Sequence, residues 1–350
     1  MKSERAVKKT LEIETSPHIV SGRSVEDIMR NVVWALLPSV AFAIYAFGLA
    51  ALWTLAVATF TCVATEYLLC RSRGESSTVW DWSATITGLI YGLTLPPALP
   101  LWMVIFGGVI AIALGKTLFG GLGKNPFNPA LVGRAFLQAA FPSAMTTWSP
   151  VLAPERFLIL PSSTLTAPFM TPQYDGFTAA TPLALQKFDS QLTEIGALMS
   201  GVTSGSLGET CALTILLGGA WLAARKMMNW RIPLAIFVTV ALLSAIFHTL
   251  DPVRYPGPLF SLFSGGLMLG AVFMATDMVA SPMTSRGVVI YGVVIGVLVV
   301  VIRFWGGMPE GVMYAILLGN ALSPHIDSLT QSRVYGHTRR AVPKREQGTG

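Results

Sequence analysis

Charged residues and cysteine are both scarce in this sequence. Only 12% of its 350 residues are Asp, Glu, Lys or Arg, against about a quarter in ordinary soluble domains. The three cysteines, Cys62, Cys70 and Cys211, exclude a disulfide framework, and no CxxC pair is present to hold an iron–sulfur cluster or a zinc ion. The sequence also lacks a GxGxxG fingerprint, a Walker A loop and an HExxH pair. The motifs that a nucleotide-binding protein or a zinc protease requires are therefore absent from the sequence.

Hydrophobic residues, by contrast, make up 53% of the chain, and the mean hydropathy is +0.60. This composition predicts an all-α polytopic membrane protein. A spanning helix needs about 20 apolar residues, because only a helix satisfies its own backbone groups in lipid. Ten segments are candidates: residues 31–48, 50–70, 82–95, 101–119, 128–141, 206–224, 232–250, 260–277, 287–303 and 308–326. The third ends at Pro96-Pro97 and the fifth begins at Asn128-Pro129, so these two are expected to be broken or half-embedded.

The charge pattern predicts the orientation of these helices. The first 30 residues are polar and show no apolar signal-peptide region, which favours a cytoplasmic N-terminus. Lys and Arg accumulate in short cytoplasmic loops. With the N-terminus inside, only four of the 24 Lys and Arg residues fall outside, namely Arg156, Lys187, Arg254 and Arg303. We therefore predict about ten transmembrane helices with both termini in the cytoplasm, and topology rather than nucleic-acid binding explains the net charge of +6.

The predicted segments divide the chain into five parts. Residues 1–30 form a cytoplasmic N-terminal segment, 31–141 a first five-helix half, 142–205 an extracytoplasmic segment, 206–326 a second five-helix half and 327–350 a basic cytoplasmic tail. A weak internal repeat relates residues 87–92 (TGLIYG) to residues 265–270 (GGLMLG). Such repeats are typical of transporters with a site at the repeat interface, so a cofactor-free secondary transporter or channel for a small polar solute is an alternative function.

A polar, glycine-rich run at membrane level stands out at residues 120–130 (GGLGKNPFNPA). Asn125-Pro126 and Asn128-Pro129 stop one helix and start another. Irregular backbone at membrane depth is tolerated where it is buried in protein or lines a cavity. We expect this loop to contact a ligand or a partner, with an ordinary cytoplasmic turn as the alternative.

Acidic residues are rare in the predicted helices. A charged acid at the bilayer centre costs at least ~3 kcal/mol, so Glu66 and Asp277 are candidates for an ion path. Residues 204–210 (SGSLGET) open the sixth predicted helix. We interpret them as an N-cap in which Glu209 complements the helix dipole, in preference to a site for an anionic group.

Residues 174–183 (YDGFTAATPL) lie in the extracytoplasmic segment. On local pattern alone they predict a surface turn followed by a short β-biased stretch.

Taken together, these segments resemble one family over nearly the whole chain. Residues 16–18 (SPH), 120–130, 204–210, 276–277 (TD) and 333–337 (RVYGH) occur in the order found in the D subunit of the Rnf electron-transport complex, which is similar to the B subunit of the sodium-translocating NADH:quinone reductase. The family's flavinylation signature, Ser/Thr-Gly-Ala-Thr, corresponds to residues 178–181. The resemblance implies that FMN is joined by a phosphoester to the hydroxyl of Thr181, with Thr178 in the same motif. Ala179 stands where glycine is usual and adds a methyl group to the loop.

The resemblance also implies cofactors, partners and an activity. Family members hold a second, non-covalent flavin such as riboflavin, which we place by analogy near Asn125 and Asn128. The expected partners are the other Rnf subunits A, B, C, E and G, the flavin transferase that attaches FMN, and membrane lipid. The implied function is a translocase subunit in the bacterial cytoplasmic (inner) membrane that couples electron flow between ferredoxin and NAD to Na⁺ or H⁺ transport, with the end reactions on partner subunits.

Overall fold

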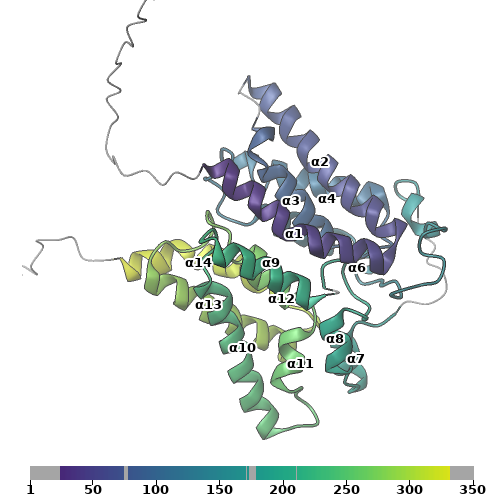
Figure 1. The fold of residues 1–350 in the computed structure, drawn as a ribbon, viewed down its shortest axis with the longest axis vertical. Coiled ribbons are helices and arrows are strands. Elements are labelled where there is room, and N and C mark those ends of the chain that lie inside the picture. The colour runs from purple at the N-terminus through teal and green to yellow at the C-terminus, as the bar shows by residue number, and fades with distance from the viewer. Residues whose placement is uncertain (1–23, 75–77, 171, 173–178, 210, 332–350) are drawn as a thin grey trace, which may run out of the picture.

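The computed structural model describes residues 24–74, 78–170, 172, 179–209 and 211–331, and within these residues it is helical without strands (Figure 1). A first group contains α1 (Val25–Phe47), α2 (Leu49–Arg73), α3 (Ser83–Leu93), α4 (Leu101–Ala113) and α5 (Pro129–Ala140), with short 3₁₀ turns at Val79–Asp81 and Thr117–Phe119. A second group contains α9 (Ala212–Ala224), α10 (Arg231–Leu250), α11 (Pro258–Phe263), α12 (Leu267–Leu269), the π-helical turn η4 (Gly270–Met274), α13 (Ser285–Trp305) and α14 (Val312–Thr330). Between the groups lie α6 (Pro142–Met145), the 3₁₀ turn η3 (Ser162–Leu165), α7 (Pro182–Asp189) and α8 (Ile195–Ser200).

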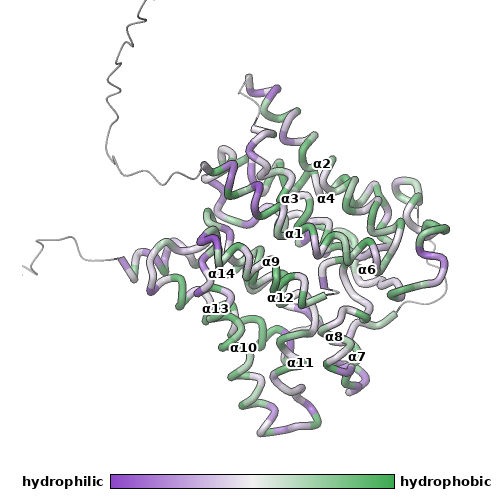
Figure 2. Tube along the Cα trace, viewed as in Figure 1, coloured by the Kyte–Doolittle hydropathy of each residue, from purple (hydrophilic) through white to green (hydrophobic). Residues whose placement is uncertain are grey.

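Hydrophobic surface identifies this bundle as a polytopic membrane protein. Five described helices are long and apolar enough to cross a membrane: α1, α2, Leu101–Phe119, α10 and α13. Along α10 every fourth residue is a large exposed hydrophobic one: Leu234, Val238, Leu242, Ile246 and Leu250. Apolar colour covers most of α10 and α13 in Figure 2, whereas polar colour gathers at helix ends and connections. A continuous apolar stripe of this kind is expected to face lipid rather than water.

Each of the ten predicted segments overlaps a helix, but several depart from a simple span. The third, fifth and sixth contain only the 11, 12 and 13 residues of α3, α5 and α9. The eighth, predicted at 260–277, is broken into α11, α12 and η4. The break falls at Gly265, whose φ is +65° and whose position leaves no room for a Cβ, since one would lie 2.5 Å from Leu183 Cδ1. The number of crossings and the direction of the termini stay predictions.

Corresponding helices of the two groups pack in the same way, through small residues. In the first group Gly108 of α4 lies against Thr61 of α2. In the second, Gly292 and Gly296 of α13 lie against Ala235 and Thr239 of α10. The groups also meet directly, because Gly218 of α9 lies against the backbone of α1 at Ala35. Backbone hydrogen bonds from Leu207 N to Leu95 O (3.1 Å) and from Gly208 N to Leu93 O (2.6 Å) join the end of α3 to the segment before α9.

A buried ion pair fixes the end of α2 to the connection after α4. Lys116 Nζ lies 2.7 and 2.8 Å from the two carboxylate oxygens of Glu66, and both side chains are buried. Ser83, at the start of α3, accepts a hydrogen bond from the same ammonium, and Thr78 donates to the carboxylate. Lys116 is therefore an interior residue near the end of the fourth predicted segment, and its charge is neutralised within the protein.

Removing one partner of this pair is expected to be costly. Lys116→Met should destabilise the protein by about 3–5 kcal/mol, because it leaves the Glu66 carboxylate buried without a counter-charge. The measurement is the thermal unfolding of the purified protein in detergent. Lys124→Met, at an exposed lysine of the same connection, is the control and should unfold like the wild type. The double variant Glu66→Gln/Lys116→Met should recover most of the loss, and an unchanged melting temperature for Lys116→Met would contradict the assignment.

Candidate functional site

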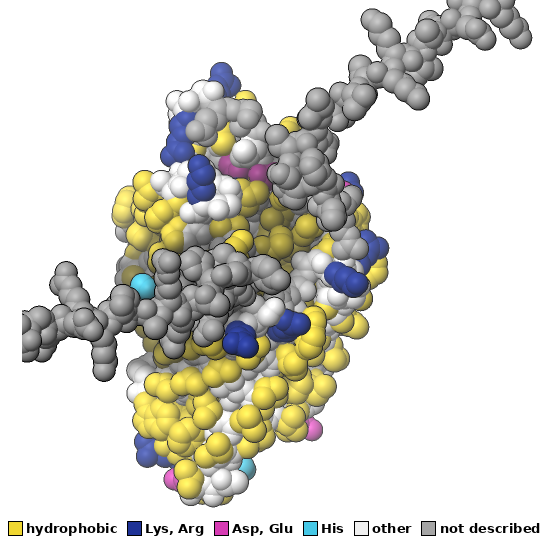
Figure 3. Space-filling view, turned by 90° about the vertical axis from the view of Figure 1, so that its left-hand side faces the viewer, with side chains coloured by type: hydrophobic (Ala, Val, Ile, Leu, Met, Phe, Trp, Pro, Cys, Tyr) yellow, Lys and Arg dark blue, Asp and Glu magenta, His cyan; other side chains and the backbone are white. Residues whose placement is uncertain are grey.

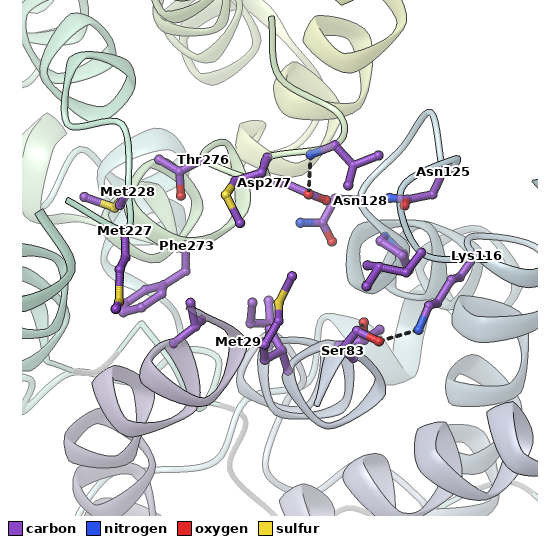
Figure 4. A pocket seen from close by; sticks show the side chains of 18 of the residues that line it. Met29, Ser83, Lys116, Asn125, Asn128, Met227, Met228, Phe273, Thr276 and Asp277 are labelled. Atoms are coloured by element: carbon purple, nitrogen blue, oxygen red, sulfur yellow. Dashed lines mark hydrogen bonds between the residues drawn. The ribbon is translucent and has the colours of Figure 1, made fainter. Parts of the chain in front are cut away.

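The first candidate site is a cavity between the two helix groups, which we call the Asn128 cavity (Figure 4). Its volume is about 110 Å³. The sequence-predicted residues Asn125, Asn128 and Asp277 all line it, together with Lys116, the partner of Glu66. Figure 4 also shows Met29, Ser83, Met227, Met228, Phe273 and Thr276 around the same space. The cavity therefore brings together residues for which the sequence predicted two separate roles, cofactor binding and ion conduction.

Asn128 holds the two halves together at this cavity. Its Oδ1 accepts a hydrogen bond from Ala130 N (3.0 Å) and caps α5, whose first residue is proline as the sequence pattern predicts. Its Nδ2 donates to the carbonyl of Met274 at the end of η4 (3.3 Å). Asn125 is also buried and donates from Nδ2 to Phe127 O (3.1 Å). The part of the loop from Asn125 to Ala130 is thus packed between the halves, whereas residues 120–124 are exposed or half-buried.

The two ion-path candidates have different surroundings. Glu66 is buried and paired with Lys116. Asp277 is half-buried, accepts a hydrogen bond from Val279 N (3.0 Å), and forms no ion pair with any residue that the structure describes. Asp277 therefore offers an uncompensated carboxylate to the cavity, and Glu66 does not.

The second candidate site, the Thr181 cavity, has a volume of about 560 Å³. Its lining comes from α5, the start of α7, the turn at Gly265, the connection before α14 and α14 itself. Thr181 lines it as the N-cap of α7, with its hydroxyl accepting a hydrogen bond from Ala184 N (3.3 Å) and Pro182 as the first helical residue. The described end of this motif leads directly into α7 at Pro182, where Thr-Pro is itself a signal for the start of a helix. Thr178 lies outside the described residues.

The α7 helix is attached to the second helix group. Lys187 Nζ donates hydrogen bonds to the carbonyls of Arg303 (2.9 Å), Gly306 (2.6 Å) and Met308 (2.9 Å). Partial burial lowers the pKa of the Lys187 ammonium from its usual value. Leu183 packs in a small cluster with Leu198 and Phe260. These contacts hold the first turn of α7, and with it Thr181, against the second helix group.

Four charged residues meet beside this cavity. Arg134 Nη2 lies 3.2 Å from Glu310 Oε2 and 3.9 Å from Glu209 Oε1. Glu310 Oε1 also accepts a hydrogen bond from Gly266 N. Arg303 donates to the carbonyls of Ser261 and Ser264. Opposite charges from both helix groups thus neutralise one another inside the protein.

Two sequence interpretations are corrected by this cluster. Residues 204–210 do not form the N-cap of the sixth helix, because α9 begins at Ala212 and its N-cap is Cys211. Glu209 Oε2 instead accepts a weak hydrogen bond from Ser206 N (3.4 Å). Arg134, counted among cytoplasmic basic residues, lies within α5 and is largely buried. Glu310 was missed, although it is an acid inside the predicted segment 308–326 and the cost of such acids could have singled it out.

Comparison with known proteins gives the family of this chain. The model of the "NQR2, RnfD, RnfE family" matches residues 12–336. The chain belongs to this family. Within it, the chain is 40% identical over 349 residues to the D subunit of the proton-translocating ferredoxin:NAD(+) oxidoreductase complex of Clostridium ljungdahlii, covering 97% of this chain and 100% of that protein.

Two further relatives extend the comparison. The D subunit of the Na(+)-translocating ferredoxin:NAD(+) oxidoreductase complex of Acetobacterium woodii is 39% identical over 333 residues, covering 94% of this chain and 96% of that protein. The D subunit of the ion-translocating oxidoreductase complex of Stutzerimonas stutzeri is 41% identical over 346 residues, covering 91% and 94%. Because the NQR2, RnfD, RnfE match spans both helix groups, it includes the lining of both cavities.

Proposed function

We propose that this chain is the membrane flavoprotein subunit of an ion-translocating electron-transport complex. It passes electrons through FMN covalently attached to Thr181 and couples electron flow between ferredoxin and NAD to Na⁺ or H⁺ transport. The names of the relatives support the complex and its ion coupling. The proposal of a covalent flavin rests on the position of Thr181, whose hydroxyl lies at the start of a helix on the wall of a large cavity.

The residues around Thr181 fit a flavin nucleotide. The cavity volume of about 560 Å³ lies within the ~300–1,000 Å³ of typical ligand sites. The start of α7 favours an anionic phosphate on the capping hydroxyl. Trp148, Phe188 and Tyr314 supply aromatic surface for a planar ring. When bound, FMN supplies the electron-transfer chemistry, while the chain binds it, orients it and keeps it from being lost.

The arrangement of the helices supports an extracytoplasmic position for Thr181. The start of α1 and the end of α14 lie on the same side of the molecule, and α6, α7 and α8 lie away from that side (Figure 1). Lys and Arg side chains appear at several points on the face that bears the two helix ends (Figure 3). Basic residues favour the cytoplasmic side. Thr181 would then face the extracytoplasmic side of the bacterial cytoplasmic (inner) membrane, the side on which, as the resemblance implies, the flavin transferase acts.

The partners follow from what this chain does not carry. Its three separate cysteines and its lack of nucleotide-binding motifs leave the reactions with ferredoxin and NAD to other subunits. We assign these reactions to the Rnf subunits A, B, C, E and G acting together. An electron that drops ~100 mV releases about 2.3 kcal/mol, which equals the cost of moving one charge against ~100 mV, so one electron step drives roughly one cation.

We place a second, non-covalent flavin such as riboflavin at the Asn128 cavity. The two buried amides there offer donors and acceptors for a flavin ring. At about 110 Å³ the cavity is smaller than the ~300 Å³ of a typical ligand site. The flexible side chains of Met29, Met227 and Met228 line it and would have to move aside.

The covalent attachment can be tested with two Thr181 variants. The full chain, produced together with the flavin transferase, should give a band on a denaturing gel that fluoresces under ultraviolet light. Thr181→Val should lose this fluorescence because it has no hydroxyl to esterify. Thr181→Asn should lose it as well while keeping an acceptor for the α7 cap, which separates attachment from folding. Thr146→Val, at another threonine of the same cavity, should remain fluorescent.

A fluorescent Thr181→Asn band would contradict the attachment site. A wild-type chain that carries no flavin, yet moves a small solute across liposomes without partners, would instead favour the transporter alternative.

The second flavin predicts a separate, extractable cofactor. Acid treatment of the wild-type protein should release non-covalent flavin and leave the gel fluorescence in place. Asn125→Ala should reduce the released flavin at least tenfold, because it removes a buried amide from the cavity without touching the Asn128 cap. Covalent fluorescence serves as the internal control for folding. Full retention of acid-released flavin in Asn125→Ala would show that the second flavin lies elsewhere.

The unpaired carboxylate of Asp277 predicts a role in ion transport. In the assembled complex, Asp277→Asn should abolish most electron-driven ion uptake into vesicles while both flavins stay bound, because the amide cannot attract a cation as the carboxylate does. Asp251→Asn, at an exposed aspartate after α10, makes the same charge change and should transport normally. Unchanged ion uptake in Asp277→Asn would exclude Asp277 from the path.

A further inference from the structure

The charged cluster beside the Thr181 cavity is unevenly satisfied. Glu310 has two partners, the Arg134 guanidinium and the Gly266 N–H. Arg303 donates to two carbonyls. Three buried atoms of the cluster, Arg134 Nε, Arg303 Nε and Glu209 Oε1, have no hydrogen-bond partner among the residues that the structure describes, and of these three side chains only Arg134 and Glu209 line the Thr181 cavity. Buried polar atoms are usually paired, so these two side chains retain one donor and one acceptor.

Both of these side chains line the same cavity as Thr181. They are nearly sequestered from solvent, with side-chain exposures of 11% for Arg134 and 8% for Glu209. At such sites a charge acts over a few ångströms with little screening by water or salt. A group tethered to Thr181 and held in this cavity would therefore experience both charges.

The chemistry of a flavin ring matches this pair. The pyrimidine edge of isoalloxazine carries an N–H donor between two carbonyl acceptors, which complements one acceptor and one donor. Reduction adds electrons to the ring and increases negative charge at this edge. A nearby cation therefore favours the reduced form, and a nearby anion favours the oxidised form.

We infer that Arg134 and Glu209 are opposing positioning residues that bind the pyrimidine edge of the Thr181 flavin and set its reduction potential. This inference rests on the proposed function, because it needs the flavin at Thr181. Arg134 raises the potential and Glu209 lowers it. Glu310 holds the Arg134 guanidinium in place from the second helix group, through the 3.2 Å ion pair.

The test is a redox titration of the flavin-loaded, full-length protein at pH 9, with dithionite as reductant and the visible flavin absorbance as readout. Burial and the neighbouring Glu310 raise the pKa of the Glu209 carboxyl to about 8, so at pH 9 this carboxyl is ionised. Arg134→Gln should lower the equilibrium constant for two-electron reduction about tenfold, a shift of about 30 mV. Glu209→Gln should raise it by a similar factor. Arg30→Gln removes the same charge at the exposed start of α1 and should leave the potential unchanged.

The opposite signs distinguish this role from a structural one, because general loosening of the cavity would shift both variants in the same direction. Shifts of equal sign, or no shift in either variant, would overturn the inference while the covalent flavin remains. If Arg134→Gln does not fold, Glu209→Gln decides the question, and a potential at or below the wild-type value overturns the inference. A wild-type chain without covalent flavin would instead refute the proposed function.

Discussion

In a bundle this apolar, every buried charge has to find its counter-charge within the protein, because neither lipid nor the core can solvate it. The first helix group meets this need internally with Glu66 and Lys116. Arg134 meets it across the groups, with Glu209 and Glu310. The second arrangement does more than stabilise, because it requires the two halves to meet in one register. The ion pairs and the Asn128 link to Met274 therefore define how the halves are joined.

Both candidate sites lie where these halves meet, and both depend on interrupted helices. The Asn128 cavity is bounded by the 120–130 loop and by the end of η4. The Thr181 cavity is bounded by α5 and by the turn at Gly265 that separates α11 from α12. In a continuous helix the backbone N–H and C=O groups hydrogen-bond to one another. A broken helix leaves amides, carbonyls and short polar side chains available to a ligand. The proline and glycine residues that interrupt the apolar runs thus create the space and the polar groups of the sites.

Local sequence pattern predicted much of this architecture. Hydropathy located α10 and α13, since their apolar runs are long and uninterrupted, and the Asn-Pro pairs predicted the loop that packs between the halves. The pattern failed where partners are distant in the chain. Arg134 and Glu310 are 176 residues apart, so no window of sequence relates them, and Arg134 was counted only as a cytoplasmic-side basic residue. For the same reason Glu209 was assigned to a helix dipole and not to its ion pair with Arg134. The α7 helix was missed because a hydropathy search gives no weight to a short polar helix.

The attachment of α7 has a mechanical consequence. Lys187 fastens this helix to the carbonyls at the end of α13, so Thr181 is part of the second half. Arg134, which lines the same cavity, belongs to α5 and the first half. A rotation of one half relative to the other would therefore change the distance between the Thr181 hydroxyl and the Arg134 guanidinium. The distance between these two residues thus reports the relative position of the two halves. The environment of a group attached to Thr181 would depend in the same way on the conformation of the whole bundle.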